Sequence, residues 1–340
     1  MAVVIYPQTL NWTYMKQRPQ QLMTQLGALG HQVFFENQSP LPLDQEFIEV
    51  EKNVFLFTDT QTFIYRTLPQ LRKQHSIVVW TTWSKLRTRI YTLFNPDAVI
   101  YDCCDEFPQW AKYEHKMVES ADHLVATAEV IQTRLSLAYP EKKITLIPNG
   151  ADTSFFQIPY QERPSDLPSG PIVAYIGAWA YWVDHALFTK LATVFPHVQF
   201  ISIGAPYGDT HDYSNLPNVH ILGEKPHDQL KRYLPYIDVA LIPFQYHPIT
   251  LATNPIKAYE YMAAGVRVLS TALPECILME PHITTATTHD DFINKLSLML
   301  NNPDNQDQRL ARIAYAQQHR WVDRGIQADL VIQSTLATKR

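Results

Sequence analysis

Short apolar runs alternate with amphipathic stretches along most of the chain. Such runs predict strands buried on both faces, as in parallel sheets covered by helices. In the first half the predicted strands are Ala2–Tyr6, Gln32–Glu36, Val54–Phe57, Ile77–Trp80, Ala98–Tyr101, Asp122–Thr127 and Ile144–Ile147. Helices are predicted between them, including Pro19–Leu29, Trp110–Ser120 and Glu129–Tyr139. This alternation predicts a doubly wound α/β sheet.

The alternation stops at residues 159–170, where several prolines and polar residues predict a linker. It then restarts, and the predicted strands are Ile172–Ile176, Val198–Ile203, Val219–Leu222, Val239–Ile242 and Val266–Leu269. Two halves of similar size favour two Rossmann-like domains over one large sheet. Ligands of such sheets bind beyond the carboxyl ends of the strands, so we expect the domains to face a central cleft.

Residues 254–265 predict a short, sharply bounded helix that feeds a strand. Asn254 is a strong N-cap residue, Pro255 suits the first helical position, and Gly265 suits a left-handed stop. Lys257 and Glu260 lie on the same side, with Glu260 inside the apolar stripe. A positive helix start, a lysine and an inward carboxylate suit a phosphate beside a ribose hydroxyl. The alternative is a surface ion pair between Lys257 and Glu260.

Charge and composition narrow the partners. The chain of 340 residues has a net charge of −5, which argues against nucleic acid as the main partner. Lys85, Arg87 and Arg89 can contact an anionic lipid headgroup or simply form a solvated helix face. No run approaches the roughly 20 apolar residues of a membrane span, and the first residues predict a strand, not a leader. Three cysteines form no disulfide framework. We therefore expect a cytoplasmic protein, with peripheral membrane contact possible.

Several familiar site motifs are absent from the sequence. It has no G-x-G-x-x-G, no G-x-x-x-x-G-K-[ST] and no G-x-S-x-G, which counts against dinucleotide oxidoreductases, P-loop NTPases and α/β-hydrolases. It has no D-x-D pair and no zinc-like Cys/His spacing, so no metal site is predicted. The kind of site that remains is one in which helix ends and side chains bind a phosphate.

Polar and aromatic residues just past predicted strands are the remaining candidates. Asp102, Asp105 and Glu106 follow Ala98–Tyr101 and can orient an acceptor hydroxyl or accept its proton, or cap the next helix. Arg18 can contact an anionic ligand or form a structural ion pair.

Aromatic residues follow the first strand of the second half directly. Trp179, after Gly177, can pack on a sugar or base, or can fill the space between domains.

An ordered series of motifs resembles family 4 retaining glycosyltransferases of the GT-B fold, close to the bacterial branch that assembles surface polysaccharides. The resemblance covers almost the whole chain. Its motifs are Trp12 with Arg18–Gln21 and Leu26, Ala121–Val125, Ile147–Asp152, Asp238–Pro243, Pro255-x-Lys257-x-x-Glu260-Tyr-x-Ala-x-Gly265, and Trp321-x-x-Arg324.

The resemblance implies an acceptor domain at 1–158, the linker at 159–170, a donor domain at 171–318 and a last helix, 319–340, that crosses back. It implies no cofactor, a nucleotide-sugar co-substrate, with UDP-sugar favoured, and a glycan or lipid-linked acceptor. The resemblance implies that Glu260 holds the ribose and that the helix start at Pro255 faces the diphosphate. From this and from the positions of residues past strand ends, we expect the catalytic residues to be Lys257, Asp105 and Arg18. The further donor contacts are expected to be Asn254, Ile256, Gly177, Trp179 and Thr253, and the acceptor contacts Trp12, Asp102 and Glu106.

The chain departs from the family pattern at the donor site. Ala252 stands where relatives have a second glutamate, and Ala178, Trp179 and Ala180 stand where an Arg and a Lys are usual. Lys257 would then be the main cation at the diphosphate, helped by Arg18. We expect a metal-independent hexosyltransferase that retains anomeric configuration. Two alternatives stay open, a sugar-nucleotide epimerase on the same fold and a non-catalytic partner subunit.

Overall fold

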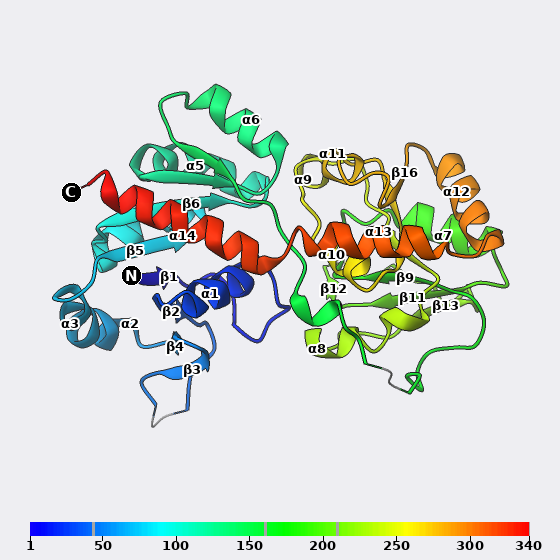
Figure 1. Ribbon diagram of the computed structural model, residues 1–340, viewed down its shortest axis with the longest axis horizontal. Coiled ribbons are helices and arrows are strands. Elements are labelled where there is room, and N and C mark those ends of the chain that lie inside the picture. The colour runs from blue at the N-terminus through cyan, green and yellow to red at the C-terminus, as the bar shows by residue number, and fades with distance from the viewer. Residues whose placement is uncertain (43–44, 160–161, 209–210, 340) are drawn as a thin grey trace. The chain divides into compact units, whose positions relative to one another are not determined.

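The computed structural model describes residues 1–340 except 43–44, 160–161, 209–210 and 340. It divides into two compact units (Figure 1). Unit 1 comprises residues 1–149 and 321–340, and unit 2 comprises residues 150–320. The chain therefore passes between the units at Asn149–Gly150 and again at Arg320–Trp321.

The prediction of an interdomain linker at 159–170 is wrong. The described part of this segment lies in unit 2, where Leu167 is buried in the core and Asp166 pairs with Lys225 at 2.9 Å. The prolines and polar residues correctly predict the absence of helix and strand in the described part of this segment, but they do not mark a boundary between domains.

Unit 1 contains a sheet with the order β3-β4-β2-β1-β5-β6-β7-β8. All neighbouring strands are parallel except β3 and β4. The strands are β1 Val3–Tyr6, β2 Gln32–Glu36, β3 Ile48–Glu51, β4 Val54–Phe57, β5 Ile77–Thr81, β6 Ala98–Cys103, β7 His123–Ala126 and β8 Ile144–Leu146. The strand order reverses between β1 and β5, which is the switch point of a doubly wound sheet.

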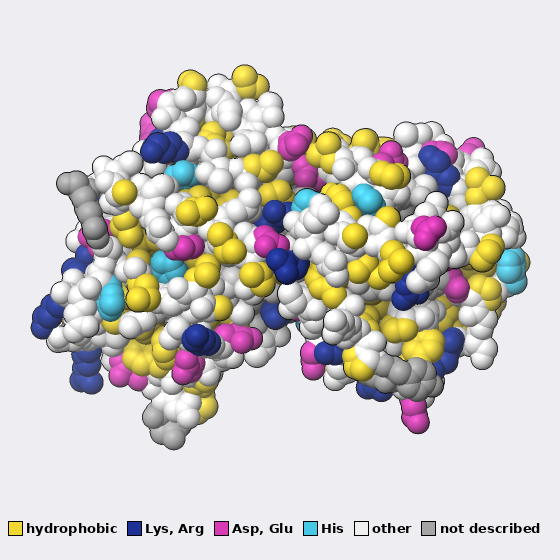
Figure 2. Space-filling model, viewed as in Figure 1, with side chains coloured by type: hydrophobic (Ala, Val, Ile, Leu, Met, Phe, Trp, Pro, Cys, Tyr) yellow, Lys and Arg dark blue, Asp and Glu magenta, His cyan; other side chains and the backbone are white. Residues whose placement is uncertain are grey.

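Helices cover the sheet of unit 1. They are α1 Arg18–Ala28, α2 Thr60–Thr62, α3 Leu68–Arg72, α4 Arg87–Arg89, α5 Pro108–Ser120, α6 Glu129–Ala138 and α14 Trp321–Ala337, with short helical turns at Phe63–Thr67, Ser84–Leu86 and Ile90–Phe94. The last helix, α14, packs along α1 (Figure 1). A side chain at Gly325 would meet Gln25 Cβ at 2.3 Å, so only glycine allows this close approach. Apolar side chains, among them Ile326 and Leu330, are exposed along α14 (Figure 2).

Unit 2 contains a fully parallel sheet with the order β13-β11-β9-β14-β15-β16. Its strands are β9 Ile172–Ile176, β11 Gln199–Ile203, β13 Val219–Ile221, β14 Val239–Ile242, β15 Arg267–Thr271 and β16 Thr284–Ala286; β10 Trp179–Ala180 pairs with β12 Pro206–Tyr207. Numbered along the chain, the order is the 3-2-1-4-5-6 of Rossmann folds, with its switch point between β9 and β14.

The helices of unit 2 lie against this sheet and enclose its apolar core. They are α7 His185–Val194, α8 His227–Leu230, α9 Pro248–Leu251, α10 Ile256–Ala263, α11 Pro274–Ile277, α12 His289–Asn301 and α13 Gln306–Gln317, with short turns at Thr153–Phe155 and Leu234–Tyr236. The strands predicted in both halves are present, and the α/β, doubly wound prediction is confirmed.

Candidate active site

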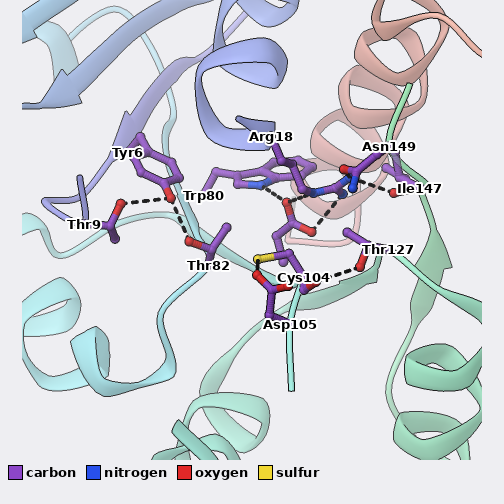
Figure 3. Close-up of polar contacts among 11 residues, drawn as sticks. Tyr6, Thr9, Arg18, Trp80, Thr82, Cys104, Asp105, Thr127, Ile147 and Asn149 are labelled. Atoms are coloured by element: carbon purple, nitrogen blue, oxygen red, sulfur yellow. Dashed lines mark hydrogen bonds and ion pairs between the residues drawn. The ribbon is translucent and has the colours of Figure 1, made fainter. Parts of the chain in front are cut away.

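The carboxyl edge of the unit 1 sheet carries a group of hydroxyls at its switch point (Figure 3). Thr9 donates a hydrogen bond to Tyr6 Oη over 3.1 Å, and Tyr6 Oη lies 2.7 Å from Thr82 Oγ1. Burial raises the pKa of the Tyr6 phenol, which keeps this hydroxyl protonated. All three residues are buried, so these hydrogen bonds stabilise the segments that follow β1 and β5.

Arg18 forms an ion pair with Asp102, and Figure 3 shows Arg18 close to Trp80 and Asn149. Arg18 Nε donates to Asp102 Oδ2 over 2.8 Å and Nη2 donates to Oδ1 over 2.9 Å, while Trp80 Nε1 donates to Oδ2 over 2.9 Å. Arg18 Nη1 donates to the carbonyl of Ile147 and to Asn149 Oδ1. Arg18 is 3% exposed and Asp102 is fully buried.

This pairing corrects two predictions. Arg18 was expected at the diphosphate and Asp102 at the acceptor, but a buried guanidinium with a bidentate carboxylate partner and two further acceptors has no exposed group to offer a ligand. A buried charge needs such compensation, because leaving it unpaired costs several kcal/mol, on the order of 3–5. Both residues therefore form a buried structural ion pair within unit 1.

Asp105 differs from Asp102, because its carboxylate forms no ion pair with any residue that the structure describes. Its carboxylate Oδ2 accepts a weak hydrogen bond from Cys104 Sγ at 3.4 Å. Burial raises the pKa of the Asp105 carboxyl to about 7, and the neighbouring Asp102 and Glu106 add to the rise. A carboxyl group with a pKa near neutrality can exchange a proton with a ligand hydroxyl.

The other predicted acceptor contacts have structural partners. Glu106 Oε1 accepts from Arg134 Nε at 2.7 Å, and Arg134 also binds Glu114. Trp12 is half-buried, lies edge-to-face on Phe35 with ring centroids 5.1 Å apart, and its backbone N–H donates to an asparagine side chain. These contacts give the Glu106 and Trp12 side chains structural roles within unit 1.

The possible lipid-binding patch is also engaged within unit 1. Arg89 pairs with the buried carboxylate of Glu36, and Arg87 Nε donates to Ser120 Oγ over 2.9 Å. The Lys85 ammonium lies 3.9 Å from the centre of the Trp83 ring. Two of the three cations thus have partners inside the fold, which removes most of the charge on which that expectation rested.

In unit 2, Lys257 extends from the first turn of α10 towards the switch point. Its ammonium lies 5.4 Å from the ring centre of Tyr175, on β9, and 4.9 Å from that of Phe244, which follows β14. A Cβ at Gly177 would come within 2.9 Å of Lys257 Cε, so this glycine leaves room for the lysine. Burial lowers the pKa of Lys257 to about 8, although Glu260 opposes that change.

Lys257 has no hydrogen bond or ion pair to any residue that the structure describes. The alternative of a Lys257–Glu260 surface ion pair is therefore wrong. Glu260 is 8% exposed, and its Oε1 lies 2.7 Å from Nε2 of His227, the first residue of α8. His227 supplies the partner that an inward carboxylate requires. The second oxygen, Oε2, makes no hydrogen bond within the described part of the chain.

The start of α10 differs in detail from the prediction. Pro255, not Asn254, is the N-cap, and no side chain caps the first turn. Asn254 is buried, and its amide donates to Glu275 and to Tyr259 Oη, which holds the loop before the helix. The first-turn amides, beginning at Ile256, consequently lack a side-chain acceptor and suit an anion.

Two further predicted donor contacts have partners within unit 2. Thr253 donates its hydroxyl to the carbonyl of Ile249 over 2.7 Å. Trp179 is 5% exposed, its indole N–H donates to Ser202, and its ring stacks on His185 with centroids 5.0 Å apart. The prediction that Trp179 stacks on a sugar or base is therefore wrong, because the ring belongs to the core of unit 2.

Sequence reasoning missed several residues at these edges. Thr9 and Thr82 follow β1 and β5, so their position past a strand end was an available signal. His227 lies 33 positions before Glu260, and no local pattern links the two.

The described residues contain neither a metal site nor a membrane-spanning helix. No group of three or more His, Cys, Asp or Glu side chains is arranged to hold a metal ion. No helix there has the length and apolar character needed to cross a bilayer.

The two Rossmann-like units, with a last helix that returns to unit 1, define the GT-B fold of glycosyltransferases, and solved structures confirm it. Sucrose-phosphate synthase from Thermosynechococcus elongatus matches 99% of both chains with a TM-score of 0.73 and 16% identity. Anabaena Alr3699/HepE, solved in complex with UDP and glucose, matches 98% of this chain and 100% of its own with a TM-score of 0.70 and 16% identity. Trehalose 6-phosphate synthase from Burkholderia multivorans matches 100% and 99% with a TM-score of 0.71 and 12% identity.

By sequence, the chain is similar to TuaH of Bacillus subtilis (strain 168), a protein named for glycosyl transfer in teichuronic acid biosynthesis. The two are 24% identical over an alignment of 262 residues, and the match covers 68% of this chain. The match spans 65% of the length of that relative. No protein-family model matches the chain.

Proposed function

We propose that this protein is a glycosyltransferase that transfers a sugar from a nucleoside-diphosphate donor to a glycan or lipid-linked acceptor. The observation that carries the proposal is Lys257, a half-buried cation without an acidic partner at the switch point of unit 2. The GT-B fold and the similarity to a protein named for teichuronic acid synthesis support the reaction class. The solved complex of HepE with UDP and glucose supports a UDP-sugar as donor.

The donor diphosphate would bind at the start of α10. There the uncapped first-turn amides and the Lys257 ammonium present positive charge to the same space. Two unit charges about 4 Å apart interact by roughly 4 kcal/mol at the effective dielectric constant of a protein surface. That interaction strengthens as negative charge grows on the leaving phosphate, so Lys257 would favour the transition state over bound substrate.

The donor ribose would bind Glu260 through Oε2, the carboxylate oxygen that His227 does not use. His227 is then a positioning residue, because its contact fixes the carboxylate plane. Gly177 would let the diphosphate approach the backbone after β9, since any side chain there meets Lys257.

The acceptor would bind unit 1 near Asp105. Asp105 would orient the attacking hydroxyl. We further propose retention of configuration, in which the departing phosphate takes the acceptor proton on the same face. Lys257 would replace a metal ion as the charge at the diphosphate, so turnover should survive a metal chelator.

Calorimetry with UDP, GDP, ADP and dTDP tests the donor site. We expect UDP to bind at one site and the Lys257→Ala variant to bind it at least tenfold more weakly. Lys190→Ala is the matched control, because Lys190 is an exposed lysine of unit 2 paired with Asp290 at 2.7 Å. A protein that binds none of the four nucleotides would be the non-catalytic subunit instead. Interconversion of UDP-sugars without release of UDP would indicate the epimerase.

A further inference from the structure

A cavity lies in unit 2 at the amino edge of its sheet, opposite the carboxyl edge that carries Lys257. It measures about 360 Å³, which is at the lower end of the range for small-molecule sites. It lies beside Arg267, the first residue of β15, whereas Lys257 lies beyond the carboxyl ends of β9 and β14. A strand as long as β15 spans roughly 16 Å, so the cavity is separate from the donor site. Its charged or titratable lining residues are Arg267, Arg312, His282 and Asp304.

In each of the two arginines, only some of the guanidinium N–H groups donate to acceptors within the protein. Arg267 donates from Nε to the carbonyl of Asp238 and from Nη1 to the carbonyls of Met299 and Asn302 at the end of α12. Among the described residues, Arg267 Nη2 has no acceptor. These contacts stabilise the helix end but leave one corner of the guanidinium unsatisfied.

Arg312, on α13, repeats this arrangement. Its Nε and Nη2 donate to the carbonyl of Gly265, and Nη2 also binds Asp304. Arg312 is 5% exposed, yet its Nη1 has no acceptor within the described part of the chain. Burial lowers the pKa of Arg312, and the charges of Arg267 and Arg309 lower it further. A buried guanidinium that is repelled by its neighbours gains from an added anion.

His282 adds a neutral polar group to the same wall. Its ring stacks on Tyr315 with centroids 4.6 Å apart, and neither ring nitrogen has a hydrogen-bond partner within the described residues. Burial and Arg312 lower the pKa of His282, so the ring is neutral at pH 7 and offers one N–H. Asp304 offsets one of the two arginine charges, which leaves the cavity positive.

We propose that this cavity binds a small phosphate-bearing anion between Arg267 and Arg312. A phosphate group has enough oxygens to accept from two guanidinium corners and an imidazole N–H, and arginine favours this ligand because of its fixed fork of donors. The proposal goes beyond the glycosyltransferase function and does not depend on it.

Calorimetry with inorganic phosphate, at constant ionic strength against chloride, tests the proposal. The Lys257→Ala variant is the background, which removes the main cation of the donor site. We expect saturable binding near one phosphate per chain. Arg267→Gln and Arg312→Gln should each weaken it at least tenfold, and Arg267→Lys should weaken it less because the charge remains.

Arg309→Gln is the matched control. It removes one positive charge next to Arg312 but does not line the cavity, so phosphate affinity should change less than twofold. Should Arg312→Gln unfold the protein, Arg267→Gln and His282→Phe decide the matter, with folding checked by circular dichroism. Absence of saturable phosphate binding, or equal losses in Arg309→Gln and Arg267→Gln, would overturn the proposal.

Discussion

At the carboxyl edge of the unit 1 sheet, Arg18, Arg89 and Arg134 each bind a carboxylate, whereas at the same edge in unit 2 Lys257 lies against two aromatic rings. At this edge, unit 1 has an acid, Asp105, that forms no ion pair, and unit 2 has a cation, Lys257, that forms none, as far as the described residues go. The two edges share a topology but keep opposite charges available. Two similar folds can thus serve different chemistry, because internal ion pairs decide which charges stay available for a ligand.

The largest effect on stability should come from breaking the buried ion pair between Arg18 and Asp102 in unit 1. Arg18→Leu should lower the free energy of unfolding by about 3–5 kcal/mol, because Asp102 is left buried without its cation. Chemical denaturation measures it. The double variant Arg18→Leu/Asp102→Leu should recover part of the loss.

The control for the Arg18→Leu variant is Arg72→Gln. Arg72 pairs with Asp97 at 3.6 Å near the surface and donates to the carbonyls of Phe94 and Asn95, so its loss should cost about 1–2 kcal/mol, less than that of Arg18. Equal losses in Arg18→Leu and Arg72→Gln would show that the buried pair contributes no more than an exposed one.

Removing the unpaired cation of unit 2 should reduce catalysis and leave the fold intact. Lys257→Ala should lower turnover of a UDP-sugar about 100-fold, by analogy with the loss of one donor from an oxyanion site. The melting temperature should change little, since Lys257 holds no hydrogen bond in the described structure. Steady-state release of UDP measures turnover, with Lys190→Ala as control. An unaltered rate would contradict the leaving-group role.

The acid of unit 1 and the cation of unit 2 should together define the pH dependence of kcat/KM. Asp105 must be ionised to orient the acceptor, and Lys257 must be protonated to hold the diphosphate. With pKa values of about 7 and about 8, activity should fall below pH 7 and above pH 8. Asp105→Asn should abolish the acidic limb only, and Lys257→Ala the basic limb only. Survival of the acidic limb in Asp105→Asn would assign it to another group.

The smallest expected effect concerns stability at Asp105. Its pKa is raised in the folded protein above the usual value of 3.8, so the folded state binds more protons between about pH 4 and pH 7. Stability should therefore decline as pH rises through that window. Asp105→Asn should flatten the decline and stabilise the protein above pH 7 by on the order of 1–2 kcal/mol after solvent screening. Denaturation curves at pH 5 and pH 8 measure it, and parallel pH dependence in both proteins would argue against the raised pKa.

Local patterns predicted what depends on local structure. Apolar runs identified the central strands, and the Pro255–Gly265 pattern located the helix that carries Lys257. The strand Ile48–Glu51 escaped notice because it is an antiparallel edge strand with alternating half-buried and exposed residues. The two-residue strands β10 and β12 are too short to produce a pattern.

Long-range partners were beyond the reach of the sequence. Arg18 and Asp102 are 84 positions apart and lie on different elements, so their types alone left the choice between ligand contact and ion pair open. Trp179 was misassigned for the same reason, because its core contacts come from His185 and Ser202.

The return of α14 to unit 1 has a consequence for the order of folding. The helix packs on α1, but its residues are synthesised only after the whole of unit 2. Domains usually fold as they leave the ribosome, N-terminal first. Here unit 2 can complete its core while unit 1 still waits for its final helix, with one face of α1 exposed to water. A nascent chain of this protein thus acquires its finished first unit last.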